Sequence, residues 1–192
     1  MASKNLKAEK QDVEAARKLL GEAGYPDGFA LTLHGPAGRY INDDKIVQVV
    51  AQMWKRVGVD TKVETMPSAI LFTRGSKLEF SAILVGWGSE TGEASSPLRA
   101  LIATYDKEKG MGVSNRGRYS NAEVDRILNT ALTTVEDPKR AALLAQATEI
   151  SMRDTAIIPL HFEVSNWATQ RGLKYIGRSD QYTFAMDLRP AK

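Results

Sequence analysis

A tryptophan, three glycines and two carboxylates lie together in one stretch, Ser81 to Glu93. The first half of this stretch, SAILV, has no polar alternation and predicts a strand buried on both faces. The second half, GWGSETGE, ends the strand. Because ligands of open α/β sheets bind outside the carboxyl ends of the strands, an indole and fixed negative charge here predict a site for a cationic ligand with a flat or extended body. The alternative is a core strand followed by an acidic surface loop.

The two carboxylates of this stretch are Glu90 and Glu93. A glycosidase needs two carboxylates about 5–9.5 Å apart across a sugar, and two glutamates in one loop rarely reach that arrangement. Glu90 as a counter-charge for a ligand ammonium group is the better hypothesis. The stretch also fails as a dinucleotide-binding loop, because its third glycine comes one residue late and Glu90 would repel a pyrophosphate.

Other chemistry-bearing residues are few. His34 and His161 fall in predicted strands without a second ligand at metal-binding spacing, so they are interpreted as packed or surface histidines. The chain has no cysteine and no Gly-x-Ser-x-Gly, so the common nucleophile signals are missing. We therefore expect no catalytic residue, no metal and no cofactor. Arg39 and Tyr40 follow the first predicted strand, which places them on the same rim as Trp87.

Composition limits the class of protein. The chain has 192 residues, of which 43% are hydrophobic and 26% charged, as in a folded globular domain. The net charge of +3 is scattered, so nucleic acid is not an expected partner. No apolar run approaches the ~20 residues of a membrane helix. The absence of cysteine is compatible with an oxidising compartment in which the fold needs no disulfide.

Apolar spacing defines the elements of the first half. Strand, helix and strand in succession form a βαβ unit, so both strands should be parallel. The predicted elements are a helix from Asp12 to Gly24, a strand from Phe29 to His34, a helix capped by Asn42 or Asp43 and ended by Gly58, a strand from Val59 to Met66, and a short helix within 67–77.

The second half is predicted to be mainly helical. A helical piece at 97–104 is followed by a loop over 106–118, with Arg116 and Arg118 exposed. Two helices then form a hairpin, the first capped by a capping box from Ser120 to Glu123 and the second starting at Asp137-Pro138. A strand is expected over 156–162, where Pro159 indicates an edge or bulge, with extended chain over 164–169 and no clear element after Gly172.

These residues together resemble a known family. The segment DVEAARKLLGEAGYPDGF at 12–29 is similar to a signature of the peptide-binding (family 5) solute-binding proteins of ABC transporters, the dipeptide, oligopeptide and nickel group. In that family a strand runs into Gly-Trp-x-x-Asp-x-x-Asp/Glu-Pro, and here it reads GWGSETGEA from Gly86 to Ala94. The similarity continues through Tyr119-Ser120-Asn121 and through Ile157 to His161.

The resemblance implies a fold and a domain organisation. The fold would be an α/β lobe of the type II periplasmic-binding-protein class, with a mixed, mostly parallel sheet flanked by helices. Residues 1–9 would be a loose tail, residues 10–172 the C-terminal lobe, and residues 173–192 an exit segment that returns to an N-terminal lobe outside this sequence. The ligand would be enclosed between the two lobes.

The resemblance also implies roles for particular residues. Glu90 takes the position of the aspartate that pairs with a peptide's α-amino group, with one methylene more, and Ala94 replaces the usual proline. The backbone at Gly86 and Gly88 would pair with an extended ligand, and Trp87 would form the wall of a side-chain pocket. Arg74 and Arg116 are candidates for a ligand carboxylate. The expected ligand-binding set is Gly86, Trp87, Gly88, Glu90, Glu93, Tyr40, Arg39, Arg74 and Arg116.

The implied function is non-catalytic. The chain would belong to the substrate-binding component of an ABC importer, which takes a peptide or small amine-bearing solute to a membrane permease. It would be periplasmic or lipid-anchored outside the cell, with the export signal outside this sequence, and its unpaired cleft face could allow self-association. The alternative is a free-standing enzyme or regulatory domain on the same lobe. The choice among dipeptide, oligopeptide, nickel chelate, opine and sugar stays open.

Overall fold

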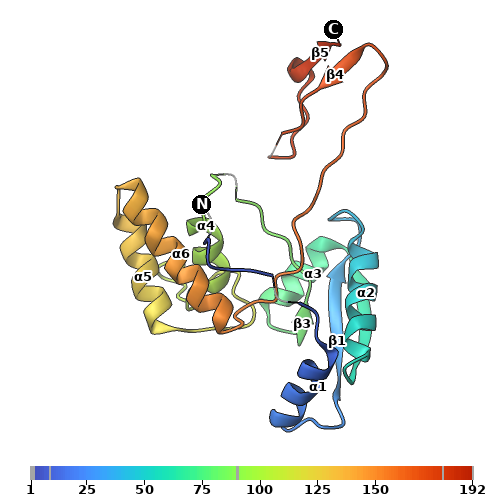
Figure 1. Ribbon diagram of the computed structural model, residues 1–192, viewed down its shortest axis with the longest axis vertical. Helices are drawn as coiled ribbons and strands as arrows, with labels where there is room; N and C mark the ends of the chain where they lie inside the picture. The colour runs from blue at the N-terminus through green and yellow to red at the C-terminus, as the bar shows by residue number, and fades with distance from the viewer. Residues whose placement is uncertain (1–2, 9, 90, 179, 192) are drawn as a thin grey trace. The chain divides into compact units, whose positions relative to one another are not determined.

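The computed structural model describes residues 3–8, 10–89, 91–178 and 180–191 (Figure 1). They form two compact units that meet between Ile157 and Ile158. The predicted organisation into a lobe over 10–172 and an exit segment over 173–192 stays a prediction.

A parallel sheet of three strands occupies the first part of unit 1. Strands β1 (Phe29–Pro36), β2 (Val59–Met66) and β3 (Ala82–Ile83) lie in the order β2-β1-β3. The register of β1 and β2 starts at Phe29 opposite Val59, and helix α2 (Asp43–Lys55) connects the two strands. The βαβ unit predicted from the sequence is therefore confirmed. The turns that precede β1 and β2 are in close contact at Gly28 and Gly58. A Cβ built on Gly28 would lie only 1.8 Å from the Gly58 carbonyl oxygen, so only glycine fits there.

The predicted central strand over 81–85 is wrong in extent and in burial. Only Ala82 and Ile83 are in β3, and the residues from Ala82 to Val85 are half-buried. The physical reason is position: β3 lies at the edge of the described sheet and pairs only with the carboxyl-terminal part of β1, with Ile83 opposite His34. The unbroken apolar run indicated an interior strand, but apolar composition alone does not separate an interior strand from an edge.

Two short helices accompany the sheet. Helix α1 (Val13–Glu22) starts where the Asp12 carboxylate accepts the Ala15 N–H at 2.8 Å, and the chain leaves it through Gly24 with φ +89°. Both predicted ends of this helix are therefore confirmed. Helix α3 (Ser68–Ser76) follows β2, as predicted, and buries Leu71.

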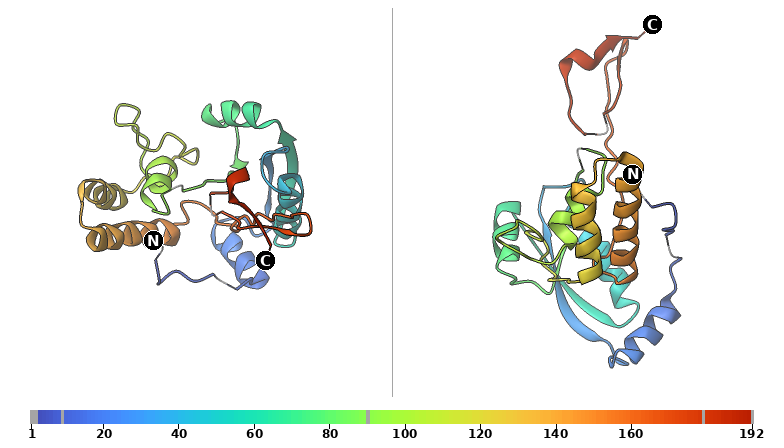
Figure 2. Two further views of the ribbon diagram at one scale, coloured as in Figure 1. Left: turned by 90° about the horizontal axis from the view of Figure 1, so that it is seen from above. Right: turned by 90° about the vertical axis from the view of Figure 1, so that its left-hand side faces the viewer.

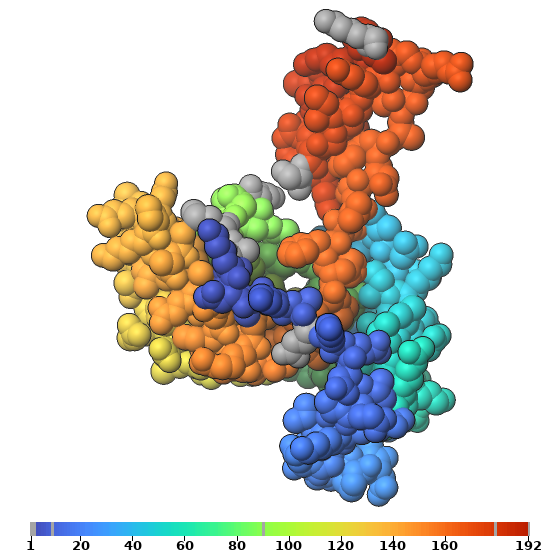
Figure 3. All heavy atoms as spheres, in the orientation of Figure 1, coloured from blue at the N-terminus to red at the C-terminus, as the bar shows by residue number. Residues whose placement is uncertain are grey.

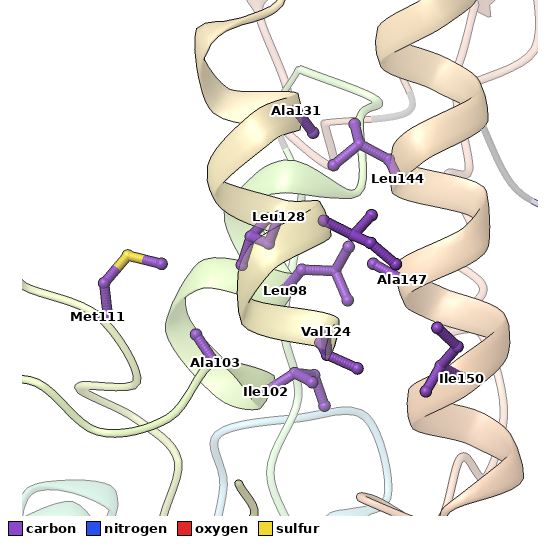
Figure 4. Packing of buried hydrophobic residues seen from close by; sticks show 11 residues of the cluster. Leu98, Ile102, Ala103, Met111, Val124, Leu128, Ala131, Leu144, Ala147 and Ile150 are labelled. Carbon is purple, nitrogen blue, oxygen red and sulfur yellow. The ribbon is translucent and has the colours of Figure 1, made fainter. Parts of the chain in front are cut away.

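A helical core fills the second part of unit 1. Helix α4 (Ser95–Pro97), the π-helical turn η1 (Leu98–Ile102), α5 (Ala122–Thr133) and α6 (Asp137–Arg153) surround it. Helices α5 and α6 pack side by side as the predicted hairpin (Figure 2). The buried cluster, shown in close-up in Figure 4, contains Leu98, Ile102, Ala103, Met111, Val124, Ile127, Leu128, Ala131, Leu144, Ala147 and Ile150.

The start of α5 differs from the predicted capping box. The Asn121 side chain, not Ser120, caps the helix by accepting the N–H groups of Glu123 and Val124. Ser120 instead bonds to the Thr104 hydroxyl at 2.8 Å. Asn is as good an N-cap residue as Ser. The helix therefore begins one residue later than the Ser120–Glu123 capping box predicts.

The N-terminal segment lies over α6 (Figure 3). The Ser3 hydroxyl and the Asn5 side-chain amide, the latter at 3.0 Å, both donate to the Glu149 carboxylate. Ser3 and Asn5 are thus both bonded to α6, and the expectation of a loose tail over residues 1–9 stays a prediction.

Unit 2 corrects two predictions about the end of the chain. No strand forms among the described residues over 156–162, since Pro159 has no N–H to donate to a strand ladder, and the side chain of Phe162 is 97% exposed. Conversely, elements do form after Gly172. Strands β4 (Leu173–Tyr175) and β5 (Leu188–Pro190) pair antiparallel, joined through the 3₁₀ turn η2 (Ala185–Asp187).

Candidate functional site

The loop between β1 and α2 is organised by one buried carboxylate. Asp43 is only 3% exposed, and its carboxylate accepts backbone N–H groups from Gly38, Arg39, Tyr40 and Asp44 at 2.8–3.2 Å. Burial by itself raises the pKa of Asp43, but these four hydrogen bonds outweigh it and lower the pKa below its ordinary value. Of the two predicted caps, Asn42 occupies the N-cap position without a side-chain bond, and Asp43 makes the bonds.

This loop places Tyr40 against the turn that follows β3. The Tyr40 hydroxyl donates to the Gly86 carbonyl at 3.3 Å, and a Cβ on Gly86 would lie 2.8 Å from a Tyr40 ring carbon. Only glycine therefore allows this close approach. The indole of Trp87 follows directly and is 45% exposed, while the Arg39 guanidinium lies 5.7 Å from the Tyr40 ring centroid. We call Arg39, Tyr40, Gly86 and Trp87 the rim.

Arg74 has partners within the protein. Its Nε donates to Glu79 at 2.7 Å, and its guanidinium lies 4.8 Å from the Phe80 ring centroid. Phe80 in turn stacks on His34 at 4.0 Å, and His34 is buried with Nε2 3.4 Å from Glu64. Of the two predicted possibilities for the histidines, packed or surface, His34 is packed and His161 is on the surface.

Arg116 is half-buried rather than exposed, which corrects the sequence prediction. Its guanidinium lies 5.4 Å from the Phe72 ring centroid, and a Cβ on Gly75 would lie 3.0 Å from its Nε. This burial lowers the pKa of Arg116 from its ordinary value. No local pattern indicates this burial, because the loop over 106–118 is mostly polar and α3 is distant in sequence. Arg118 is exposed, as predicted, and lies 3.9 Å from the Tyr105 ring centroid.

The remaining predicted site residues lie in the turn after Trp87. Gly88 has open space around it, with no atom within 4 Å of a built Cβ. Glu93 forms a half-buried ion pair with Arg140 of α6, so its charge is balanced inside unit 1. Glu90 lies outside the described residues, and its proposed pairing with an ammonium group stays a prediction from the sequence.

Two residues that support the candidate site residues were missed by sequence reasoning: Asp43 holds the loop of Tyr40, and Phe72 lies against Arg116. Asp43 was considered only as a helix cap, although an aspartate four residues after Arg39 in a glycine-containing turn is a signal for backbone capture. Phe72 was not considered, because only the fold brings it to Arg116.

The described residues contain neither a metal-ligand cluster nor a candidate membrane-spanning helix. Among the residues that the structure describes, no group of three or more His, Cys, Asp or Glu could hold a metal ion. Within the same residues, no helix has the length and apolar character needed to cross a membrane.

The comparisons with known proteins agree with this architecture. A family described as "Bacterial extracellular solute-binding proteins, family 5 Middle" matches residues 2–109. Heme-binding protein A of Haemophilus influenzae is 31% identical over 156 residues, which cover 80% of this chain and 28% of that protein. Glutathione-binding protein GsiB of Escherichia coli K12 is 32% identical over 157 residues, which cover 79% of this chain and 30% of that protein.

Solved structures show the same fold. HbpA2 of Haemophilus parasuis superposes with a TM-score of 0.80 at 23% identity, covering 99% of this chain and 38% of that one. DppA of Helicobacter pylori, solved with the peptide STSA, gives a TM-score of 0.72 at 23% identity, covering 80% of this chain and 29% of that one. The predicted type II periplasmic-binding-protein class, an α/β fold with a mostly parallel sheet, is confirmed.

The chain spans less than a third of the length of these curated relatives. The family match nevertheless covers more than half of the chain, and the matched residues include the whole βαβ unit and the rim. The chain therefore belongs to the bacterial extracellular solute-binding proteins of family 5.

Proposed function

We propose that this chain is one lobe of the substrate-binding component of an ABC importer, and that it binds peptides or related small solutes at the rim. The observation that carries the proposal is the packing of Tyr40 on Gly86 beside the exposed Trp87, at the carboxyl ends of β1 and β3. The protein would act outside the cytoplasm, without turnover, and would pass its solute to a membrane permease.

The edge position of β3 supports binding of an extended solute. The ladder between β1 and β3 ends where the Leu84 N–H donates to the His34 carbonyl at 2.8 Å. Beyond that point the backbone at Gly86 and Gly88 is exposed and has no described strand on its outer side. An extended peptide can add to such an edge through main-chain hydrogen bonds, with side-chain pockets giving specificity.

The rim supplies an apolar wall. Trp87 offers a rigid indole, and the Tyr40 ring is fixed beside it by the Asp43 carboxylate through the loop backbone. Aromatic side chains bind apolar and amphipathic ligands with little loss of conformational entropy. Glu90 is predicted to lie in the site, where its carboxylate would supply the counter-charge for an ammonium group of the solute. A second lobe, contributed by chain outside this sequence, would close over the solute.

Related proteins support a solute of this class. The names of the relatives refer to heme and glutathione, and the solved neighbours include proteins in complex with the peptides STSA and Met-Leu. Glutathione and these peptides share an ammonium group, an amide backbone and carboxylates, so we extend that chemistry to the present protein.

The test is calorimetric titration of the full-length protein with glutathione, with di- to tetrapeptides and with hemin. We expect one of these to bind without being converted, and Trp87→Ala to weaken that binding by about tenfold or more, the scale of a central aromatic contact. Val135→Ala is the control, since Val135 is 91% exposed in the turn between α5 and α6. Unchanged affinity in Trp87→Ala would remove the rim from the site, and product detected by mass spectrometry would favour an enzyme.

A further inference from the structure

The ladder between β1 and β3 stops for a reason that lies in β1. Its last bond runs from the Leu84 N–H to the His34 carbonyl at 2.8 Å. Two residues after His34, β1 ends at Pro36, which has no N–H to donate to the next position of the neighbouring strand. The main chain of Gly86 and Gly88 therefore continues without a partner strand among the described residues.

A side chain takes the place of the missing strand at Gly86. The Tyr40 hydroxyl donates to the Gly86 carbonyl at 3.3 Å, so this carbonyl faces the loop that follows β1. The ring lies against the glycine, since a Cβ on Gly86 would be 2.8 Å from Cε1 and 3.0 Å from Cζ of Tyr40. A strand added at this edge would bring a main-chain N–H to the same carbonyl oxygen. The tyrosine hydroxyl thus occupies the position of a main-chain donor.

The fold of the loop, more than this one bond, holds Tyr40 in place. The hydroxyl bond is long for an O–H···O contact. The loop, however, is fixed by the buried Asp43 carboxylate, which accepts the N–H groups of Gly38, Arg39 and Tyr40 at 2.8–3.2 Å. A solute amide can reach the Gly86 carbonyl only by displacing the hydroxyl, and the exchange of one neutral hydrogen bond for another gives no net gain in affinity.

The part of this edge that stays open is short. A Cβ built on Gly88 would have no atom within 4 Å. Directly after it the chain turns back, because the Ser89 carbonyl accepts the Gly92 N–H at 3.1 Å. Between the Tyr40 contact and this turn lie Trp87 and Gly88. Because a strand pairs residue by residue, these two positions can hold about two residues of an extended solute.

We propose that the Tyr40 hydroxyl excludes Gly86 from the main-chain contacts of the solute. The solute main chain is then held at Trp87 and Gly88, and the protein gains nothing from peptides longer than about two or three residues. This inference rests on the proposed function and narrows the edge of that site, since the family resemblance implies pairing at both Gly86 and Gly88. It assigns the limit on solute length to one side chain of the loop between β1 and α2.

The test measures the binding of alanine peptides to the full-length protein by calorimetry. In the unaltered protein, tetraalanine should bind no more tightly than trialanine. Tyr40→Phe removes the hydroxyl and keeps the ring. We expect it to bind tetraalanine about three- to tenfold more tightly than the unaltered protein does, the scale of one main-chain hydrogen bond, and to leave the affinity for dialanine unchanged.

Singly N-methylated tetraalanines identify the bond, because each lacks one N–H. One methylated position should lower the affinity of Tyr40→Phe about three- to tenfold and that of the unaltered protein less than about twofold. The matched control is Tyr25→Phe, which removes the hydroxyl of a half-exposed tyrosine whose ring lies on Phe29 at the amino end of β1. It should show the affinities and the methylation profile of the unaltered protein.

Three results would each overturn the inference while the receptor function stands. They are equal or weaker binding of tetraalanine by Tyr40→Phe, an equal gain for dialanine, and identical methylation profiles. Binding of glutathione without binding of any alanine peptide would overturn it as well. Failure of every solute to bind would overturn both proposals. Tyr40→Leu also lacks the hydroxyl, so its methylation profile should show the same new sensitive position and decides if Tyr40→Phe does not fold.

Discussion

The helical and strand parts of unit 1 bury different kinds of polar group. The helical part buries the neutral side chains of Asn115 and Ser151, and both are hydrogen-bonded to backbone carbonyls. The eleven residues of the main buried cluster all come from the segment between Leu98 and Ile150, and all are apolar. The strand part buries the titratable side chains of His34 and Asp43, and the covered nitrogens without a described partner, His34 Nδ1 and Arg116 Nε, lie in or against it. Polar burial lowers stability unless it is compensated, so this contrast indicates that the helices supply stability and the strands supply recognition.

The largest expected effect tests the helical side. Leu128→Ala removes a fully buried side chain from the centre of the cluster. We expect the free energy of unfolding to fall by about 2–5 kcal/mol, because a cavity adds to the lost transfer energy. Urea unfolding measures this loss, and calorimetry on the folded protein should give unchanged solute affinity. If Leu128→Ala kept its stability and lost solute affinity, the helical part would take part in recognition, and the proposed division of stability and recognition between the two parts would be wrong.

An intermediate effect is expected at Asp43. Asp43→Asn weakens charge-assisted hydrogen bonds to the loop backbone, so we expect a loss of about 1–3 kcal/mol at neutral pH. Because the pKa of Asp43 is lowered in the folded protein, its contribution is complete above the unfolded carboxyl pKa of about 4 and disappears as the pH falls through the lower folded value. The stability gap between Asp43→Asn and the unaltered protein should therefore close in acid.

The control for this experiment is Asp44→Asn, one residue later and exposed. It should change stability by well under half as much and show no comparable closing of the gap. Asp43→Asn should also weaken solute binding, since the loop that it fixes carries Tyr40. Full affinity in that variant would show that Tyr40 does not depend on the Asp43 carboxylate.

The smallest effect is expected at the junction of the two parts. Glu93 belongs to the predicted ligand set, but its carboxylate is paired with Arg140. Glu93→Gln should cost about 1 kcal/mol of stability, a modest value because the pair is only partly shielded from water. Solute affinity should change by less than about threefold. A tenfold loss, with none in the exposed control Glu108→Gln, would place Glu93 in the binding site after all.

Sequence reasoning was most successful where a pattern is local. The parallel strands at 29–36 and 59–66, the hairpin of α5 and α6, and the ends of α1 follow from residue spacing and caps that lie within a few positions of each other. The family resemblance added the fold class, which no local pattern could provide.

The failures concern contacts between distant segments. Three features depend on residues that are tens of positions apart in the sequence. They are the edge position of β3, the burial of Arg116 by α3 and the ion pair of Glu93 with Arg140. The strand expected over 156–162 needs a partner that no residue pattern within the segment reveals. The hairpin of β4 and β5 also depends on contacts between residues that are distant in sequence. The Trp167 ring packs on Gly177, and its indole N–H donates to the Thr183 hydroxyl.

The contact between Gly28 and Gly58 has a consequence for how such a protein can diversify. It lies immediately before the first paired residues, Phe29 and Val59, and so fixes the alignment of β1 and β2 at their amino ends. The rim lies at the opposite ends of the strands. The alignment of β1 and β2 is thus set about eight residues away from the rim. Loops at the rim can therefore change in length and composition, and with them the solute preference, without shifting the sheet.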